Sequence, residues 1–272
     1  ISKKMNYSKD LIDFLNVSPV NFHAVKEVAR RLDNAGYKYL SAEEKLGEVK
    51  AGDKFYVTKN DSSIYAFQIG KQTLGEAGFH IICAHSDSPT FRIKPNAEMT
   101  CERGMTKLNT EVYGGPIMST WFDRPLSIAG RVIIKTDDVM HPETRLLKVE
   151  RPVLLIPNLA IHFNRQVNDG VKLSKQKDML PIIGIVNDEL EKGNMLMNLI
   201  CSELGVQKSD ILDFDLYLYD VTPACLVGIH DEFISAGRID DLSMVHAGLA
   251  ALLADTETVP ETTKVLAIFD NE

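Results

Sequence analysis

Two short apolar runs of the same design constrain the fold more than any other feature of the sequence. Residues 79–84 lead directly into His85-Ser86-Asp87-Ser88-Pro89, and residues 265–269 lead into Asp270-Asn271-Glu272. Each run has the length and apolar content of a buried β-strand, and each ends in imidazole or carboxylate groups. In open α/β sheets, ligands bind at the carboxyl ends of the strands. The two runs therefore predict an α/β sheet with a functional site at that edge.

The composition is that of a globular protein large enough to bury one large core or two ordinary ones. The chain has 272 residues, of which 44% are hydrophobic and 25% charged. A net charge of -8 argues against nucleic acid or an anionic membrane surface as a partner. We find no run of eighteen apolar residues and no charged-then-apolar leader, so we expect neither a transmembrane helix nor a signal peptide. The four cysteines are widely spaced without a CxxC pair, which predicts free buried thiols and a cytoplasmic location.

Hydrophobic periodicity predicts helices on both sides of the first apolar run. Residues 7–17 have helical spacing, and Ser18-Pro19 predicts the N-cap and first turn of a second helix that ends near Gly36. A β-hairpin, residues 54–58 and 64–69, follows. Near the end of the chain, an apolar stripe from residue 242 to 253 predicts a helix that Asp240 or the next aspartate can cap.

The middle of the chain has a different character. Between residues 96 and 235, short β-prone runs at 111–113, 126–134, 153–156 and 215–219 are broken by Gly and Pro. One helix is expected at 194–204, capped by Asn194 and ended by Gly205. We therefore predict a mixed-sheet α/β domain formed by 1–95 and 236–272, interrupted by an inserted β-rich domain at 96–235.

The polar residues at the strand ends match the needs of a metal-dependent hydrolase. Such an enzyme uses imidazole and carboxylate ligands, often with a carboxylate bridging two metals, and a separate carboxylate as general base. His85 is a candidate ligand, and Asp87 can bond its other ring nitrogen and fix its tautomer. Asp240 is a candidate bridging ligand, and Glu272 is a candidate base.

Each of these residues also has a simpler explanation. A lone His-x-Asp pair is a weak metal signal, Asp240 is equally well explained as a helix cap, and Glu272 by itself carries little information. A serine nucleophile at Ser86 or Ser88 is disfavoured, because no Gly-x-Ser-x-Gly turn surrounds either residue. From these residues alone, a metallohydrolase site is one hypothesis among several.

Five segments, in order along the chain, share motifs with one family. They are Ala-His-Ser-Asp-Ser-Pro at 84–89, Tyr-Gly-Gly at 113–115 with Ser-Thr-Trp-Phe-Asp-Arg-Pro-Leu at 119–126, Asn-Leu-Ala-Ile-His at 158–162, Ala-Gly-Arg-Ile-Asp-Asp-Leu at 236–242, and Phe-Asp-Asn-Glu at 269–272. Together these segments resemble the signatures of the aspartyl aminopeptidase family of zinc metallopeptidases. They span almost the whole chain, so chance agreement is not credible.

The resemblance implies a role for each matching residue. His85 corresponds to a zinc ligand and Asp87 to the aspartate that orients it, while Asp240 corresponds to the carboxylate that bridges two zincs. Glu272 falls on the general base of the family's Asp-Asn-Glu-Glu motif. His162 matches a histidine that projects into a neighbouring subunit's site and helps to hold the substrate.

The resemblance also implies an activity and an assembly. The expected protein removes an N-terminal, acidic residue (Asp or Glu) from peptides with a zinc-activated water. It holds two zincs per site, although cobalt or manganese would also suit oxygen-rich ligands. The β-rich insertion would be a dimerisation domain, and dimers would assemble into a homo-oligomeric dodecamer.

The chain departs from the family pattern at four places, of which Ser86 in the place of the motif's Thr is a mild change. Asp241 stands where the motif has Asn, and Asn158 stands where it has His. The motif's second Glu would follow Glu272, so we expect the remaining ligands in a longer chain. Two alternatives stay open: a related di-metal aminopeptidase of neutral or basic specificity, and a non-catalytic oligomerisation module.

Overall fold

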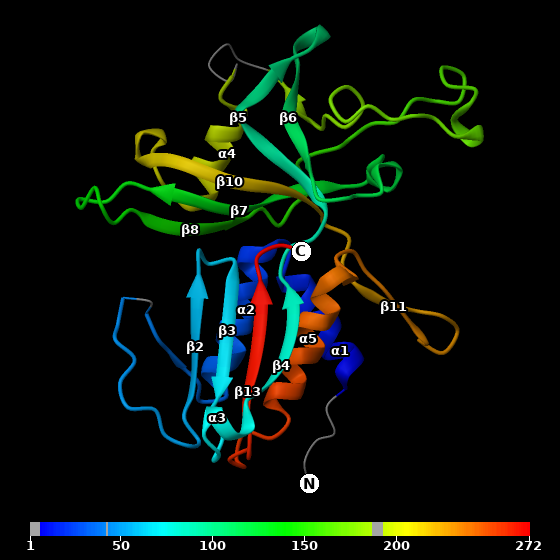
Figure 1. Ribbon diagram of the computed structural model, residues 1–272. Coiled ribbons are helices and arrows are strands. Elements are labelled where there is room, and N and C mark those ends of the chain that lie inside the picture. The colour runs from blue at the N-terminus through cyan, green and yellow to red at the C-terminus, as the bar shows by residue number, and fades with distance from the viewer. Residues whose placement is uncertain (1–5, 42, 187–192) are drawn as a thin grey trace. The chain divides into compact units, whose positions relative to one another are not determined.

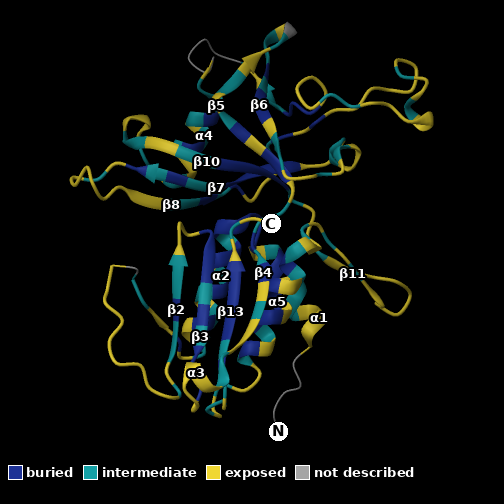
Figure 2. Cartoon of the chain, in the orientation of Figure 1, coloured by how far each residue is buried: buried dark blue, intermediate teal, exposed yellow. Residues whose placement is uncertain are grey.

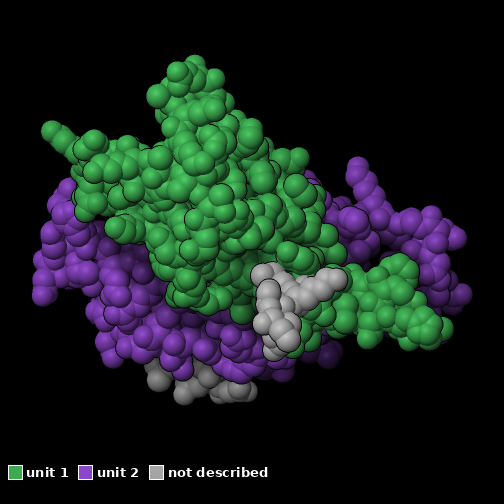
Figure 3. Space-filling model, turned by 90° about the horizontal axis from the view of Figure 1, so that it is seen from below, with its two compact units in different colours: residues 1–88, 223–272 green, residues 89–222 purple. Residues whose placement is uncertain are grey.

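The computed structural model describes residues 6–41, 43–186 and 193–272 and divides the chain into two compact units. One unit comprises residues 1–88 and 223–272, and the other comprises residues 89–222 (Figure 3). The predicted domain boundaries at 95/96 and 235/236, and the predicted role of the insertion in dimerisation, stay predictions.

The first unit contains the two strands that the apolar runs predict. Its helices are α1 (Tyr7–Val17), α2 (Asn21–Asn34), α3 (Leu74–Ala77) and α5 (Ile239–Leu253). Its strands are β1 (Lys38–Tyr39), β2 (Lys54–Lys59), β3 (Ser63–Gln68), β4 (Phe79–His85), β11 (Cys225–Val227), β12 (Phe233–Ser235) and β13 (Thr263–Phe269). Five of the described strands form a mixed sheet in the order β1-β2-β3-β13-β4, and β11 and β12 form a separate hairpin (Figure 1).

The two strands lie side by side and end together. β13 runs parallel to β4 and antiparallel to β3. The register pairs Phe269 with His85, the last residues of the two strands. Side chains that are 184 residues apart in the sequence therefore emerge at the same edge of the sheet.

Helices α2 and α5 cover one face of this sheet, and α1 packs against both helices (Figure 1). The predicted apolar stripe of α5 is buried there through Leu242, Val245, Leu249 and Leu252. Gly248 allows a close approach, because a Cβ at this position would lie 2.9 Å from side-chain atoms of β4 and β13. The position of α5 on the sheet fixes where its first residues lie.

The prediction that β4 is a buried strand is only half right. Phe79 is 47% exposed and Ile81 is 56% exposed. Most of β4 is accordingly coloured as exposed or intermediate in Figure 2. β4 is the outermost strand of the described sheet, and the helices cover only the face toward which Ile82 and Ala84 point. Because side chains alternate along a strand, the apolar residues between them point away from this core.

Two predicted helix caps are wrong. α2 is preceded by Val20, and Ser18 instead follows the last turn of α1, where its N–H donates to the Leu15 carbonyl. Asp240 does not cap α5 with its side chain, and both it and Asp241 have non-helical backbone angles within the first turn.

The 89–222 unit is built on an antiparallel sheet. Its described strands are β5 (Thr90–Thr100), β6 (Met105–Tyr113), β7 (Leu126–Ile134), β8 (Glu143–Lys148), β9 (Ile182–Ile185) and β10 (Ile211–Asp220), in the sheet order β8-β7-β10-β5-β6-β9. Helix α4 (Met195–Leu204) buries Leu196 and Ile200 and ends at Gly205 in a left-handed conformation, as predicted. The strand predicted at 153–156 is wrong, because that segment makes only isolated bridges.

The four cysteines are free, but the prediction that they are buried is wrong for Cys83 and Cys225, which are exposed. The other two are partly buried. None of the helices in the described ranges is both long and apolar enough to cross a membrane.

Candidate metal centre

His85 is the last residue of β4, and its ring is held by Asp87 two residues further along the chain. His85 Nδ1 lies 2.7 Å from Asp87 Oδ1. A carboxylate only accepts, so in the neutral ring Nδ1 carries the hydrogen and Nε2 keeps its lone pair free for a ligand bond. This is the arrangement in which an outer carboxylate fixes the tautomer of a metal-binding histidine.

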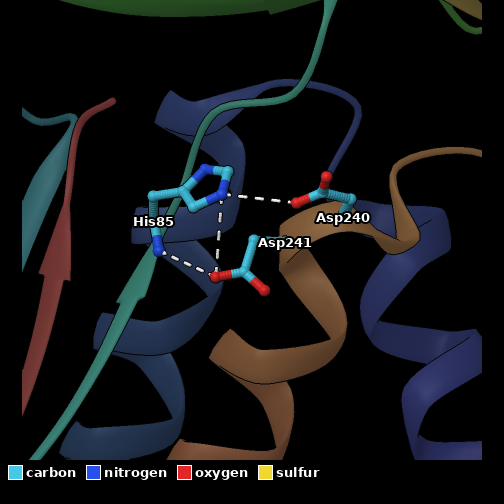
Figure 4. A group of neighbouring side chains, drawn as sticks. All are labelled: His85, Asp240 and Asp241. Atoms are coloured by element: carbon cyan, nitrogen blue, oxygen red, sulfur yellow. Dashed lines mark hydrogen bonds and ion pairs between the residues drawn. The ribbon is translucent and has the colours of Figure 1, made fainter. Parts of the chain in front are cut away.

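Two aspartates from the start of α5 meet the other side of this ring (Figure 4). His85 Nε2 lies 3.3 Å from Asp240 Oδ1 and 3.7 Å from Asp241 Oδ2. Asp241 Oδ2 also accepts from the backbone N–H of His85, at 3.2 Å. One ligand atom from each of the three residues lies within 4.8 Å of the others, which is close enough to hold one metal ion.

The charges of the cluster act on His85. Burial lowers the pKa of its imidazole, but the hydrogen bond to Asp87 and the negative charges of Asp87, Asp241 and Asp240 outweigh this and raise the pKa above its ordinary value. The cluster therefore favours a positive charge at Nε2, which a proton or a metal cation can supply.

The residues fit a divalent metal such as zinc. One imidazole nitrogen and carboxylate oxygens form the donor set that zinc accepts, and the tautomer of the histidine is already fixed. The side chain of Asp240 is 83% exposed, so its oxygens are open to ligands other than His85.

Contacts outside the cluster hold the start of α5. Arg238 has a left-handed backbone conformation, and its guanidinium donates to the carbonyls of Leu15 and Ser18 at the end of α1. Ser88 Oγ donates to the Asp240 carbonyl at 3.2 Å. These bonds position the two aspartates opposite the end of β4.

The end of β13 is tied to the same edge. The Ser86 N–H donates to the Phe269 carbonyl at 2.8 Å, which extends the parallel pairing one residue beyond β4. Asn21 Nδ2, from the first residue of α2, donates to Asp270 Oδ1 at 2.8 Å. Glu272 follows two residues later and is exposed.

The structure thus brings together His85, Asp87 and Asp240 among the predicted site residues. Glu272 follows the strand that ends beside His85, while His162 lies on an exposed turn of the 89–222 unit. The individual roles of these five residues stay predictions.

Sequence patterns do not predict the contacts of two residues at this edge of the sheet. Asp241 fits a helix cap and departs from the motif's Asn, and its position next to Asp240 is the signal in the sequence that points to the site. Asn21 had no local signal at all, because its partner Asp270 is 249 residues away.

The α/β unit gathers a histidine and two aspartates at the carboxyl ends of parallel strands. The chain is therefore of the class of α/β proteins that have a candidate divalent-metal centre at this edge of the sheet. Residues 14–272 match the family described as aminopeptidase I zinc metalloprotease (M18). The chain belongs to the M18 family of zinc metalloproteases, and the predicted family resemblance is confirmed.

Individual relatives agree with this assignment. A probable M18 family aminopeptidase 2 of Clostridium acetobutylicum is 52% identical over 272 residues, which are 100% of this chain and 62% of that protein. The structure of Chaetomium thermophilum mApe1 is 34% identical with a TM-score of 0.87, covering 97% of this chain and 62% of that one. The structure of the S. cerevisiae mApe1 dodecamer is 26% identical with a TM-score of 0.81, covering 97% of this chain and 60% of that one.

These matches confirm the predicted mixed α/β fold. The chain spans 62% of the length of the Clostridium relative, so the activity of the whole protein is a matter for proposal.

Proposed function

We propose that the protein containing this chain is a zinc-dependent aminopeptidase. The observation that carries the proposal is the cluster of His85, Asp240 and Asp241 at the edge where β4 and β13 end. The cluster occurs in a chain of the M18 family, whose relative from Clostridium acetobutylicum is named an aminopeptidase.

The metal-holding residues would be His85 and Asp240, with Asp240 shared between two zinc ions and Asp87 orienting the histidine. Asp241 lies close enough to be a further ligand in the place of the motif's asparagine. When bound, zinc supplies Lewis acidity, which lowers the pKa of a water molecule and polarises the substrate carbonyl. Cobalt or manganese would suit the same oxygen-rich donors.

Glu272 would be the general base. It would take a proton from the attacking water and pass it to the amine that leaves when the first peptide bond breaks. Its place three residues after Phe269, which pairs with His85, supports this role. His162 would help to hold the peptide, as the resemblance implies.

The assembly and the substrate preference belong to the same proposal. The S. cerevisiae mApe1 structure is a dodecamer, and we propose that this protein also forms a dodecamer. The dodecamer would assemble from dimers formed through the β-rich region. The protein would be located in the cytoplasm. The favoured substrates would be peptides with an N-terminal Asp or Glu.

The role of Glu272 is tested in the full-length protein with Glu272→Gln. The amide cannot accept the proton, so we expect kcat to fall by about 10²–10⁴-fold while zinc content stays at the parental value. Glu257→Gln, an exposed change just before β13, is the matched control and should behave like the parent. Activity of Glu272→Gln within a fewfold of the parent would exclude the proposed base.

The alternatives are separated by metal analysis and a panel of aminoacyl anilides. Equal rates on Asp and Leu substrates would exclude strict acidic specificity and favour the neutral or basic alternative. A full-length protein without zinc and without peptidase activity would favour the oligomerisation module.

A further inference from the structure

Asn21 makes an unusual connection between the start of the chain and the segment that carries the proposed base. It is the first residue of α2 and is only 6% exposed. Its side-chain nitrogen Nδ2 donates to Asp270 Oδ1 at 2.8 Å. Asp270 is the first residue after β13, and Glu272 lies two residues further on.

The amide group of Asn21 is fixed in one orientation by its two partners. Asn21 Oδ1 accepts from the Phe22 N–H at 2.9 Å, so the oxygen is on the side of the helix backbone. The Asp270 carboxylate can only accept, so it requires the nitrogen of the amide on the other side. A charged acceptor also makes this hydrogen bond stronger than a neutral one.

The backbone of the same segment is held from a second direction. The Ser86 N–H donates to the Phe269 carbonyl, and Ser86 Oγ donates to the Ser62 carbonyl at 2.6 Å within the core of the unit. Ser86 ties Phe269 to β4 through its backbone, whereas Asn21 is bonded to the side chain of the next residue. The exit of the chain from β13 is thus fixed on two sides.

We propose that Asn21 is a positioning residue, which anchors Asp270 and thereby sets where the 270–272 segment carries Glu272 relative to His85. This inference rests on the proposed function of Glu272 as general base. Catalysis is sensitive to such placement, since a displacement of about 1 Å can cost about 10²-fold in rate.

The test exchanges donor and acceptor in the full-length protein. Asn21→Asp removes the donor and places two carboxylates against each other, so we expect kcat to fall at least about tenfold with KM and zinc content unchanged. Asp270→Asn keeps an acceptor oxygen for Asn21 and should lose less. The double variant Asn21→Asp with Asp270→Asn restores the bond with the roles exchanged and should return kcat to within about threefold of the parent.

A second measurement does not depend on activity. Hydrogen exchange of the Phe269–Glu272 amides should be faster in Asn21→Asp than in the parent and should recover in the double variant. Asn34→Asp, the same change at the exposed last residue of α2, is the matched control and should match the parent in both measurements.

The outcomes separate this inference from the proposed function. If the parent is active and Asn21→Asp keeps kcat within twofold, or if the double variant is no better than Asn21→Asp, the inference is wrong. Unchanged exchange in Asn21→Asp refutes the anchor even if the parent has no peptidase activity. A zinc-loaded parent that cleaves none of the peptides refutes the proposed function and the catalytic part of the inference together, while the exchange data still decide the anchor.

Discussion

At the scale of single residues, the ring of His85 shows how the cluster is built. Asp87 bonds Nδ1, and Asp240 faces Nε2, so the two nitrogens of one imidazole have separate tasks. Only 14% of the Asp87 side chain is exposed, which limits the water that could replace it as an acceptor. Asp87 is therefore expected to act on metal affinity through the histidine without binding the metal itself.

We predict that Asp87→Asn weakens zinc binding by the full-length protein about 10–100-fold, the usual cost of removing an outer carboxylate from a ligating histidine. Competition titration against a zinc chelator measures this change. Asp61→Asn, in the exposed turn between β2 and β3, should leave the affinity at the parental value. Parental affinity in Asp87→Asn would show that the hydrogen bond does not tune the ligand.

At the scale of helices and strands, a polar cluster joins α1 to α2 and α5, the two helices that cover the sheet. Asp10 of α1 accepts from Arg31 of α2 at 2.8 Å and lies 2.6 Å from His246 Nε2 of α5. The guanidinium of Arg31 also lies over the ring of Phe14, and His246 is only 5% exposed. Since α5 carries Asp240 in its first turn, this cluster helps to hold the helix that presents the site.

The pKa of the Asp10 carboxyl predicts how this cluster responds to acid. Burial raises that pKa, but hydrogen bonds from His246 and Arg31 outweigh burial and lower it below its ordinary value of 3.8. A lowered pKa in the folded state contributes stability above pH 3.8, and this contribution is lost as the pH falls through the folded-state pKa.

We therefore expect Asp10→Asn to lower the free energy of unfolding at neutral pH. We also expect that free energy to decrease less steeply in Asp10→Asn than in the parent as the pH falls below 3.8. Chemical denaturation across this range measures both effects. Asp13→Asn, an exposed change on the same helix, is the control. Equal acid sensitivity in Asp10→Asn and the parent would contradict the assigned role of the cluster.

At the scale of the whole molecule, the chain returns to its first unit after 134 residues of the second unit. The metal cluster joins residue 85 to residues 240 and 241, so a bound ion would connect the two parts of one discontinuous unit. A ligand that binds only the folded protein stabilises it by RT ln(1 + [L]/Kd), which is about 2.7 kcal/mol when the free ligand concentration is 100 times Kd.

Metal removal should therefore lower the Tm of the full-length protein, and added zinc should restore it. His85→Ala should show a smaller zinc-dependent shift, because the imidazole ligand is missing. His230→Ala, at an exposed position of the hairpin, should respond to zinc like the parent. An equal zinc-dependent shift in His85→Ala would show that the stabilising ion binds elsewhere.

The sequence by itself determined most of the elements and the edge where the candidate site forms. Helical spacing at Tyr7–Val17 and the apolar runs that became β4 and β13 depend on neighbours in the chain, so local pattern is sufficient to find them. The acids and imidazole after those strands marked the carboxyl edge of the sheet. Motif likeness then indicated the metalloprotease family.

Only the tertiary structure decided which side chains face one another. The approach of Asp241 to His85, the bond from Asn21 to Asp270 and the one-sided exposure of β4 all depend on how α2 and α5 cover the sheet. The contacts of His85 with Asp241 and of Asn21 with Asp270 join residues that are 156 and 249 positions apart. Such contacts leave no periodic pattern in the local sequence, because each residue fits the pattern of its own helix or strand with or without its distant partner. The local sequence locates the ends of the strands, whereas tertiary packing determines which side chains contact those ends.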